Sequence, residues 1–281
     1  MPNRMNILAR IFRRLILRYR VSKKWLYWQT HSIDADSSVV FILGCQRSGT
    51  TLLCNIFNTD YRVSLFQENS AITGTEHGRL RMKPFDQVQA TFVKVKTPLI
   101  VAKPLVESQK AIQLLRCFPQ SRVLWTYRQY KDVVSSNVKK FQHQIRNLES
   151  IVKSLPDDWR AEMVSDKTRA LISRLYSVEM SRYDAAALFW YARNILFFEL
   201  GLHEHPSVRL CKYENLVSNP RESIQNIYNF IEFALPPSIS TSVREVVSTS
   251  IGLGKDIELT DEVDKLCAEL QARLDEIWKG Q

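Results

Sequence analysis

Residues 39–53 have the sequence VVFILGCQRSGTTLL, and this stretch decides the fold. It begins with a run of β-branched and apolar residues, breaks at Gly44, and returns to an apolar helical pattern after Gly49. This order predicts a buried parallel strand, a tight loop and a helix. The two glycines have the G-x-x-x-x-G spacing of a phosphate-binding loop, whose backbone N–H groups and following helix N-terminus form an anion site.

One residue separates this loop from those that bind nucleoside triphosphates. Thr50 stands where such loops carry the Lys that reaches the β- and γ-phosphates, and the cation lies inside the loop as Arg47. The site therefore suits a shorter anion bound without metal. The run R-S-G-T-T-L resembles the 5′-phosphosulfate loop of bacterial and Golgi-type sulfotransferases, which use 3′-phosphoadenosine-5′-phosphosulfate (PAPS). The alternative is a glycine-containing turn that binds nothing. The resemblance implies that the phosphosulfate is held by Arg47, Ser48, Gly49, Thr50 and Thr51.

A second motif follows the apolar strand expected at residues 121–127. Residues 128–136 read RQYKDVVSS. They resemble the family pattern R-x-P-x-D-x-x-x-S, in which the Arg and the Ser bind the 3′-phosphate of PAPS; Arg128 and Ser136 have that spacing, and Tyr130 replaces the usual Pro. A guanidinium supplies paired donors to a phosphate. The alternative is a surface pair of Arg128 and Asp132 at a helix start.

Two further candidates follow strands expected at residues 62–66 and 98–102. In open parallel sheets ligands bind beyond the carboxyl ends of the strands, which is where Glu68 and Lys103 lie. Resemblance to the tyrosylprotein sulfotransferases, which carry a catalytic Glu about twenty residues after the loop Arg, implies that Glu68 is the general base. The family resemblance also implies that Lys103 contacts the bridging oxygen and the sulfuryl group. The alternatives are a solvated carboxylate and a helix-start Lys.

The acceptor pocket is expected from residues 70–97, a long loop or short helices, and from the helix-rich residues 137–203. Within the apolar helix expected at residues 183–200, Trp190 and Arg193 are pocket candidates, although aromatic residues at this spacing more often form core.

The last third of the chain contains two segments that resemble parts of the family. Residues 212–217, which follow a strand expected at 207–211, are close to the family's Y-E-D-L-V segment and are given a structural role only. Ser250 and Lys255, in a Ser/Gly-rich loop, are candidates to close over the nucleotide, although the cytosolic enzymes' R-K-G-x-x-G motif is not present.

Charge divides the chain into two parts. The net charge is +10, but residues 1–31 hold eight basic and no acidic residues, so the body has little net charge and nucleic-acid binding is disfavoured. We expect a basic amphipathic segment at 1–36 and the sulfotransferase domain at 37–281. Residues 5–28 have apolar and basic positions at helical spacing, which fits either a helix docked on the domain or weak association with an anionic membrane surface. The five scattered cysteines favour reduced thiols and a cytoplasmic protein, peripheral at the membrane if that helix binds it.

Together these features predict a three-layer α/β sandwich with a central parallel sheet of about five strands, like the P-loop nucleoside triphosphate hydrolases. The expected reaction is metal-independent transfer of the sulfuryl group of PAPS to the hydroxyl or amine of a small molecule, glycan or lipid. Glu68 would take the acceptor proton while Arg47 and Lys103 stabilise developing charge. The alternatives are a P-loop kinase of a small metabolite and a catalytically inert nucleotide-binding scaffold.

Overall fold

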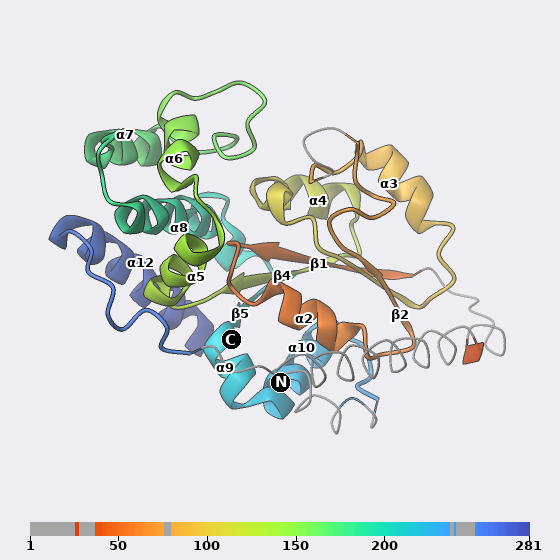
Figure 1. Cartoon of the computed structure of the whole chain (residues 1–281). Helices are drawn as coiled ribbons and strands as arrows, with labels where there is room; N and C mark the ends of the chain where they lie inside the picture. Colours follow the sequence, from red (N-terminus) through yellow and green to blue (C-terminus); the bar gives the residue numbers. More distant parts are fainter. Residues whose placement is uncertain (1–25, 28–36, 76–79, 237–238, 240–250) are drawn as a thin grey trace, which may run out of the picture.

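A five-stranded parallel sheet forms the centre of the protein (Figure 1). The computed structural model describes residues 26–27, 37–75, 80–236, 239 and 251–281. The strands are β1 (Ser38–Gly44), β2 (Val63–Phe66), β3 (Leu99–Ala102), β4 (Arg122–Tyr127) and β5 (Val208–Lys212). Their order across the sheet is β2-β3-β1-β4-β5, and every neighbouring pair is parallel. The carboxyl ends of all five strands therefore meet at one edge of the sheet.

Helices cover both faces of the sheet. In Figure 1, α2, α9 and α10 lie on one side, and α4, α5, α8 and α12 lie on the other. The helices and 3₁₀ segments are α2 (Thr50–Phe57), α3 (Phe85–Phe92), η2 (Leu105–Lys110), α4 (Ala111–Cys117), α5 (Tyr130–Lys140), α6 (Gln144–Val152), α7 (Asp166–Leu175), α8 (Arg182–Glu199), η3 (Leu202–Glu204), α9 (Tyr213–Ser218), α10 (Pro220–Phe230) and α12 (Asp261–Lys279). The predicted three-layer α/β fold is confirmed.

The central strand β1 supplies side chains to two separate hydrophobic cores. Val40 and Ile42 pack in the core under α2 and α10, whereas Phe41 and Leu43 pack in the core on the other face. This alternation follows from the two-residue period of a strand. Because both faces are covered, residues 39–43 of the strand are all apolar, which is the pattern that the sequence shows.

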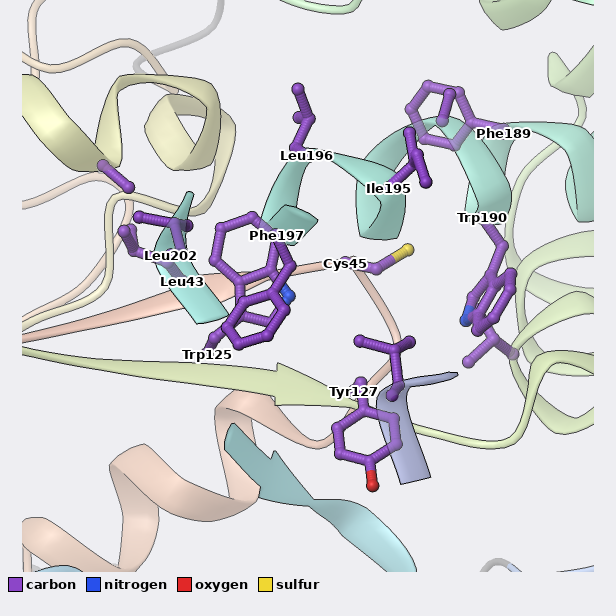
Figure 2. Packing of buried hydrophobic residues seen from close by; sticks show 14 of the residues in the cluster. Leu43, Cys45, Trp125, Tyr127, Phe189, Trp190, Ile195, Leu196, Phe197 and Leu202 are labelled. Atoms are coloured by element: carbon purple, nitrogen blue, oxygen red, sulfur yellow. The ribbon is translucent and has the colours of Figure 1, made fainter. Parts of the chain in front are cut away.

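The larger core lies between the sheet and α8. Trp125 and Phe197 lie with their ring centroids 5.8 Å apart, and both are fully buried (Figure 2). Helices α5, α6 and α12 all pack against α8. This long helix therefore fixes the elements that follow β4 relative to the sheet, including those that build the site.

The predicted strands agree with the observed ones to within a residue or so at each end. After β3 the chain does not form one continuous α-helix, because the 3₁₀ segment η2 comes first and the α-helix α4 follows it. Within residues 70–97, α3 is the one α-helix among the described positions. Of the segment 5–28, the structure describes Leu26 and Tyr27, so its two interpretations lie outside the described residues. No helix in the described ranges combines the length and the apolarity that crossing a membrane requires.

Candidate functional site

The loop after β1 is shaped by Gly44 and its neighbours. Gly44 has φ 121°, and a Cβ placed on it would lie 2.2 Å from the carbonyl oxygen of Thr126. Its backbone N–H donates to Ser108 Oγ at 3.0 Å. Only glycine fits this close approach and this positive φ, so Gly44 allows the chain to leave the central strand and enter the loop at this point.

Gly49 joins the loop to the end of β5. It is the N-cap of α2 with φ 87°, and a Cβ on it would lie 2.4 Å from Tyr213 Cδ2. The guanidinium carbon of Arg128 lies 4.3 Å from the centroid of the same Tyr213 ring. Tyr213 therefore lies between the two sequence motifs. From the sequence, this segment is expected to have a structural role only. Tyr213 nevertheless follows a strand at the same sheet edge as Glu68 and Lys103, and this position could have identified it as a residue of the site.

Arg47 and Ser136 come from the two motifs and meet directly. Arg47 Nε donates to Ser136 Oγ at 2.8 Å. Burial, together with the nearby positive charge of Arg128, lowers the pKa of Arg47 from its usual value. Both effects disfavour a lone cation, so a bound anion between the two guanidinium groups would relieve them.

Asp132 fastens the C-terminal segment to the second motif. Its carboxylate pairs with Arg128 at 3.1 Å and accepts the backbone N–H groups of Gly252 and Gly254, each at 2.9 Å. A Cβ on Gly254 would lie 2.3 Å from the backbone of Lys131, so this packing also requires glycine. The sequence identifies Asp132 as part of the second motif but does not predict that it binds the C-terminal segment.

Of the two C-terminal candidates, the structure describes Lys255, and it does not line the site as expected. Lys255 is exposed and lies outside the cavity described below, because the bonds to Asp132 direct the neighbouring Leu253 toward the cavity instead. Ser250 lies outside the described residues.

Glu68 and Lys103 form an ion pair at the carboxyl edge of the sheet. Glu68 Oε2 lies 2.6 Å from Lys103 Nζ. The pairing of β2 with β3 brings Phe66 beside Ala102, and Glu68 and Lys103, which follow these strands, therefore lie next to each other. Their side chains are 20% and 7% exposed, so Glu68 is the more open of the two.

These groups line one cavity of about 1280 Å³. Among the sequence candidates, those that line it are Arg47, Gly49, Thr50, Thr51, Glu68, Lys103, Arg128 and Ser136. Ser48 differs from the expectation: its side chain is 1% exposed, does not line the cavity, and its hydroxyl has no hydrogen-bond partner among the described residues. It lies between Arg47 and Gly49, which both have positive φ, and this turn directs it into the protein.

The far half of the cavity is built by α6 and the loop after it. His143, Arg146, Asn147 and Ser150 line the cavity, and their spacing places them on one face of α6. The following loop adds Lys153, Leu155, Asp158, Trp159 and Arg160. Residues 137–203 were expected to contribute to the acceptor pocket, and Trp190 and Arg193 of the helix at 183–200 were the named candidates. The residues of α6 that line the cavity are instead polar side chains repeated at helical spacing.

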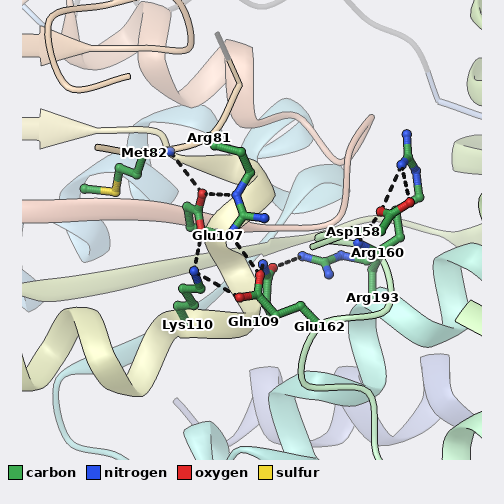
Figure 3. A network of polar contacts seen from close by, with 9 residues as sticks. All are labelled: Arg81, Met82, Glu107, Gln109, Lys110, Asp158, Arg160, Glu162 and Arg193. Atoms are coloured by element: carbon green, nitrogen blue, oxygen red, sulfur yellow. Dashed lines mark hydrogen bonds and ion pairs between the residues drawn. The ribbon is translucent and has the colours of Figure 1, made fainter. Parts of the chain in front are cut away.

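A polar network holds that loop against η2 (Figure 3). Glu107, 2% exposed, accepts from Arg81 Nε at 2.7 Å and from the backbone N–H of Met82 at 3.0 Å. Arg81 also pairs with Glu162 at 3.0 Å, and Lys110 pairs with Glu162 at the same distance. Three chain segments that are far apart in sequence are thereby fixed around the cavity.

Trp190 and Arg193 belong to this support and do not line the cavity, which corrects their assignment as pocket candidates. Arg193 is 1% exposed, donates to Gln109 at 3.1 Å and lies 5.1 Å from the Trp159 ring centroid. Burial lowers the pKa of Arg193 to about 10. Trp190 is fully buried and donates to the carbonyl oxygen of Arg128 at 3.3 Å. Both side chains lie on the core side of α8. Through these contacts Trp190 supports Arg128 and Arg193 supports Trp159, which do line the cavity.

In the described part of the chain, no three His, Cys, Asp or Glu side chains are grouped as a metal ion would require. The absence of a metal from the reaction stays a prediction.

Comparison with known proteins gives the family. The model of the sulfotransferase domain matches residues 37–251. The sulfotransferase STF9 from Mycobacterium avium shares 11% identity with a TM-score of 0.50, over 89% of this chain and 81% of that one. The mouse sulfotransferase SULT7A1, solved with PAP, shares 12% identity with a TM-score of 0.43, over 85% of this chain and 84% of that one. At such identities the likeness concerns the fold. Among curated protein sequences there is no significant match.

Proposed function

The chain belongs to the sulfotransferase family and is a sulfotransferase enzyme, and from this premise we propose that it moves the sulfuryl group of PAPS to an acceptor hydroxyl or amine. The observation that supports this proposal is the convergence of both sequence motifs on one cavity, through Arg47, Arg128 and Ser136. The family membership also argues against the kinase alternative.

The loop and the second motif would hold the two anionic ends of the donor. Thr50 and Thr51, with the loop N–H groups including that of Ser48, would bind the 5′-phosphosulfate. Arg128 and Ser136 would bind the 3′-phosphate. Because Arg47 contacts Ser136 within the same cavity, it would lie between the two ends and reach either one.

Glu68 and Lys103 would carry the chemistry. Glu68 would accept the proton of the acceptor hydroxyl as the new O–S bond forms, a contribution typically worth ~10²–10⁴-fold in rate. Lys103, 2.6 Å from Glu68, would stabilise the electron pair that the bridging oxygen keeps when its bond to sulfur breaks. The products are the sulfated acceptor and 3′,5′-adenosine bisphosphate (PAP). The ion pair would hold both side chains beside the reacting groups before either substrate binds.

The test is transfer of labelled sulfate from PAPS to a panel of phenol, alcohol and amine acceptors, with Glu68→Gln and with Glu179→Gln as the exposed control. We expect Glu68→Gln to lower kcat by about 10²–10⁴-fold, with little change in PAP affinity, and Glu179→Gln to behave as wild type. Undiminished kcat in Glu68→Gln would contradict the base assignment. PAP binding without transfer to any acceptor would favour the inert scaffold.

We further propose that residues 37–281 form the catalytic domain and that the basic segment 1–36 is separate from it. A cytoplasmic protein with weak association to anionic membranes through residues 5–28 fits this division. Binding of the full chain, and not of a chain starting at residue 37, to anionic vesicles would support it.

A further inference from the structure

The cavity is large enough for two ligands. Single ligands of drug size occupy about 300–1,000 Å³, and the cavity of about 1280 Å³ extends well past the groups assigned to the donor. Its far half is bounded by α6, η2, α8 and the loop at residues 153–160. The chemistry of this half therefore describes the acceptor.

One part of that half is apolar and open to water. Leu80, Phe141 and Leu155 are 39%, 40% and 42% exposed, and all three line the cavity from different segments of the chain. Deeper in, Trp159 and Phe189 line it with rings in edge-to-face contact, 6.1 Å between centroids. Apolar side chains that converge from separate segments on one cavity mark a place where apolar ligand surface is buried.

The carboxylates in the same half are neutralised, whereas two of the cations that line it are not. The two carboxylates that line it each have a cationic partner: Glu149 pairs with Lys153, and Asp158 pairs with Arg160 at 2.9 Å. Arg146, on the polar face of α6, and Lys140, at the end of α5, form no ion pair within the described part of the chain. Lys140 Nζ lies 5.6 Å from the Phe141 ring centroid, whereas Arg146 stands on the face of α6 that lines the cavity. The acceptor half therefore carries a surplus of positive charge beside an apolar wall.

We propose that the acceptor is an anionic amphiphile, in which an apolar body joins the reacting hydroxyl to a separate carboxylate or sulfate that Arg146 binds. This inference rests on the proposed function for the direction of the hydroxyl, which must point to Glu68. The apolar body lies against Leu80, Phe141 and Leu155, and the anion lies over the α6 face. A neutral acceptor would leave the charge of Arg146 unused, and a purely polar one would leave the apolar wall in water.

The test is calorimetric binding of ω-hydroxy fatty acids of increasing length, compared with the matching α,ω-diols, at concentrations below micelle formation. Binding is measured without PAPS, and PAP binding is measured separately, so failure of the donor assignment is distinguishable from failure of the acceptor class. We expect the acids to bind more tightly than the diols and affinity to rise with chain length.

The variants separate charge from shape. Arg146→Gln is expected to weaken the acids about fivefold, the scale of an ion pair partly open to water, and to leave the diols unchanged. Arg146→Lys is expected to restore most of the loss. Arg116→Gln, an exposed arginine on α4 outside the cavity, makes the same change in net charge and is expected to alter neither. Equal binding of acids and diols, an equal loss of both in Arg146→Gln, or no binding of either class would overturn the proposal.

Discussion

The carboxylate of Asp132 offers a sharp test of how the C-terminal segment is held. The side chain is 4% exposed and makes three polar contacts: an ion pair with Arg128 at 3.1 Å and acceptance of the N–H groups of Gly252 and Gly254, each at 2.9 Å. Asp132→Asn keeps the size and shape but removes the charge. Its amide NH₂ group would also face one donor in place of an acceptor oxygen.

The magnitude follows from these contacts. Hydrogen bonds to a charged group contribute about 1.5–3 kcal/mol each, and loss of one partner of a buried ion pair costs about 3–5 kcal/mol. Because asparagine keeps one acceptor oxygen, we expect about 3 kcal/mol of destabilisation. For a chain of this size each kcal/mol lowers Tm by about 2–4 °C, so Tm should fall by roughly 6–12 °C.

The assay combines thermal unfolding with hydrogen exchange. The amides of Gly252 and Gly254 should exchange faster in Asp132→Asn, while β1 and β4 keep their protection. The matched control is Asp166→Asn, whose carboxylate is fully exposed and 3.5 Å from Arg169; its effect should stay below about 1 kcal/mol. Unchanged exchange at the two glycines, together with a Tm close to wild type, would refute the role of Asp132.

Three other predictions concern single residues. Gly49→Ala should destabilise more than Gly201→Ala, since both glycines have positive φ but only at Gly49 would a Cβ clash with Tyr213, at 2.4 Å; urea unfolding with equal losses would refute this. Burial raises the pKa of Glu214, so the folded state holds its proton more tightly and stability falls as pH rises from the usual glutamate range through the raised value. Glu214→Gln should therefore gain stability relative to wild type across that rise, and a pH-independent difference would contradict it. Alkylation followed by mass spectrometry should modify exposed Cys117 first, because burial raises the pKa of the other four thiols; early labelling elsewhere would argue against the packing.

The sequence predicted the parts of the site that strand ends determine. Glu68 and Lys103 follow adjacent strands, and a parallel sheet brings such positions together whatever the loops do, which is why their pairing could be expected. Arg128 and Ser136 could be expected on the same grounds, because Arg128 directly follows β4 and Ser136 lies within the helix α5 that comes next.

Contacts between distant segments could not be predicted in this way. The bond of Arg47 to Ser136 depends on a positive φ at Arg47, which residue type alone does not indicate. The burial of Ser48 has the same origin. Arg193 looked like a pocket cation, but its partners come from η2 and the loop at Trp159, which no periodicity relates to α8. The sequence therefore located the cavity residues at the strand ends better than those supplied by the helices and loops around them.

The most direct test of the central claim is calorimetry of PAP binding, with and without Mg²⁺, beside ATP with Mg²⁺. The protein is expected to bind PAP tightly and independently of metal, and to prefer it to ATP with Mg²⁺. Arg47→Gln should weaken PAP binding by roughly tenfold or more, since it removes a charge-assisted contact at a partly buried site, whereas Arg116→Gln should not. Preference for ATP with Mg²⁺, or PAP binding that is unchanged in Arg47→Gln, would contradict the account.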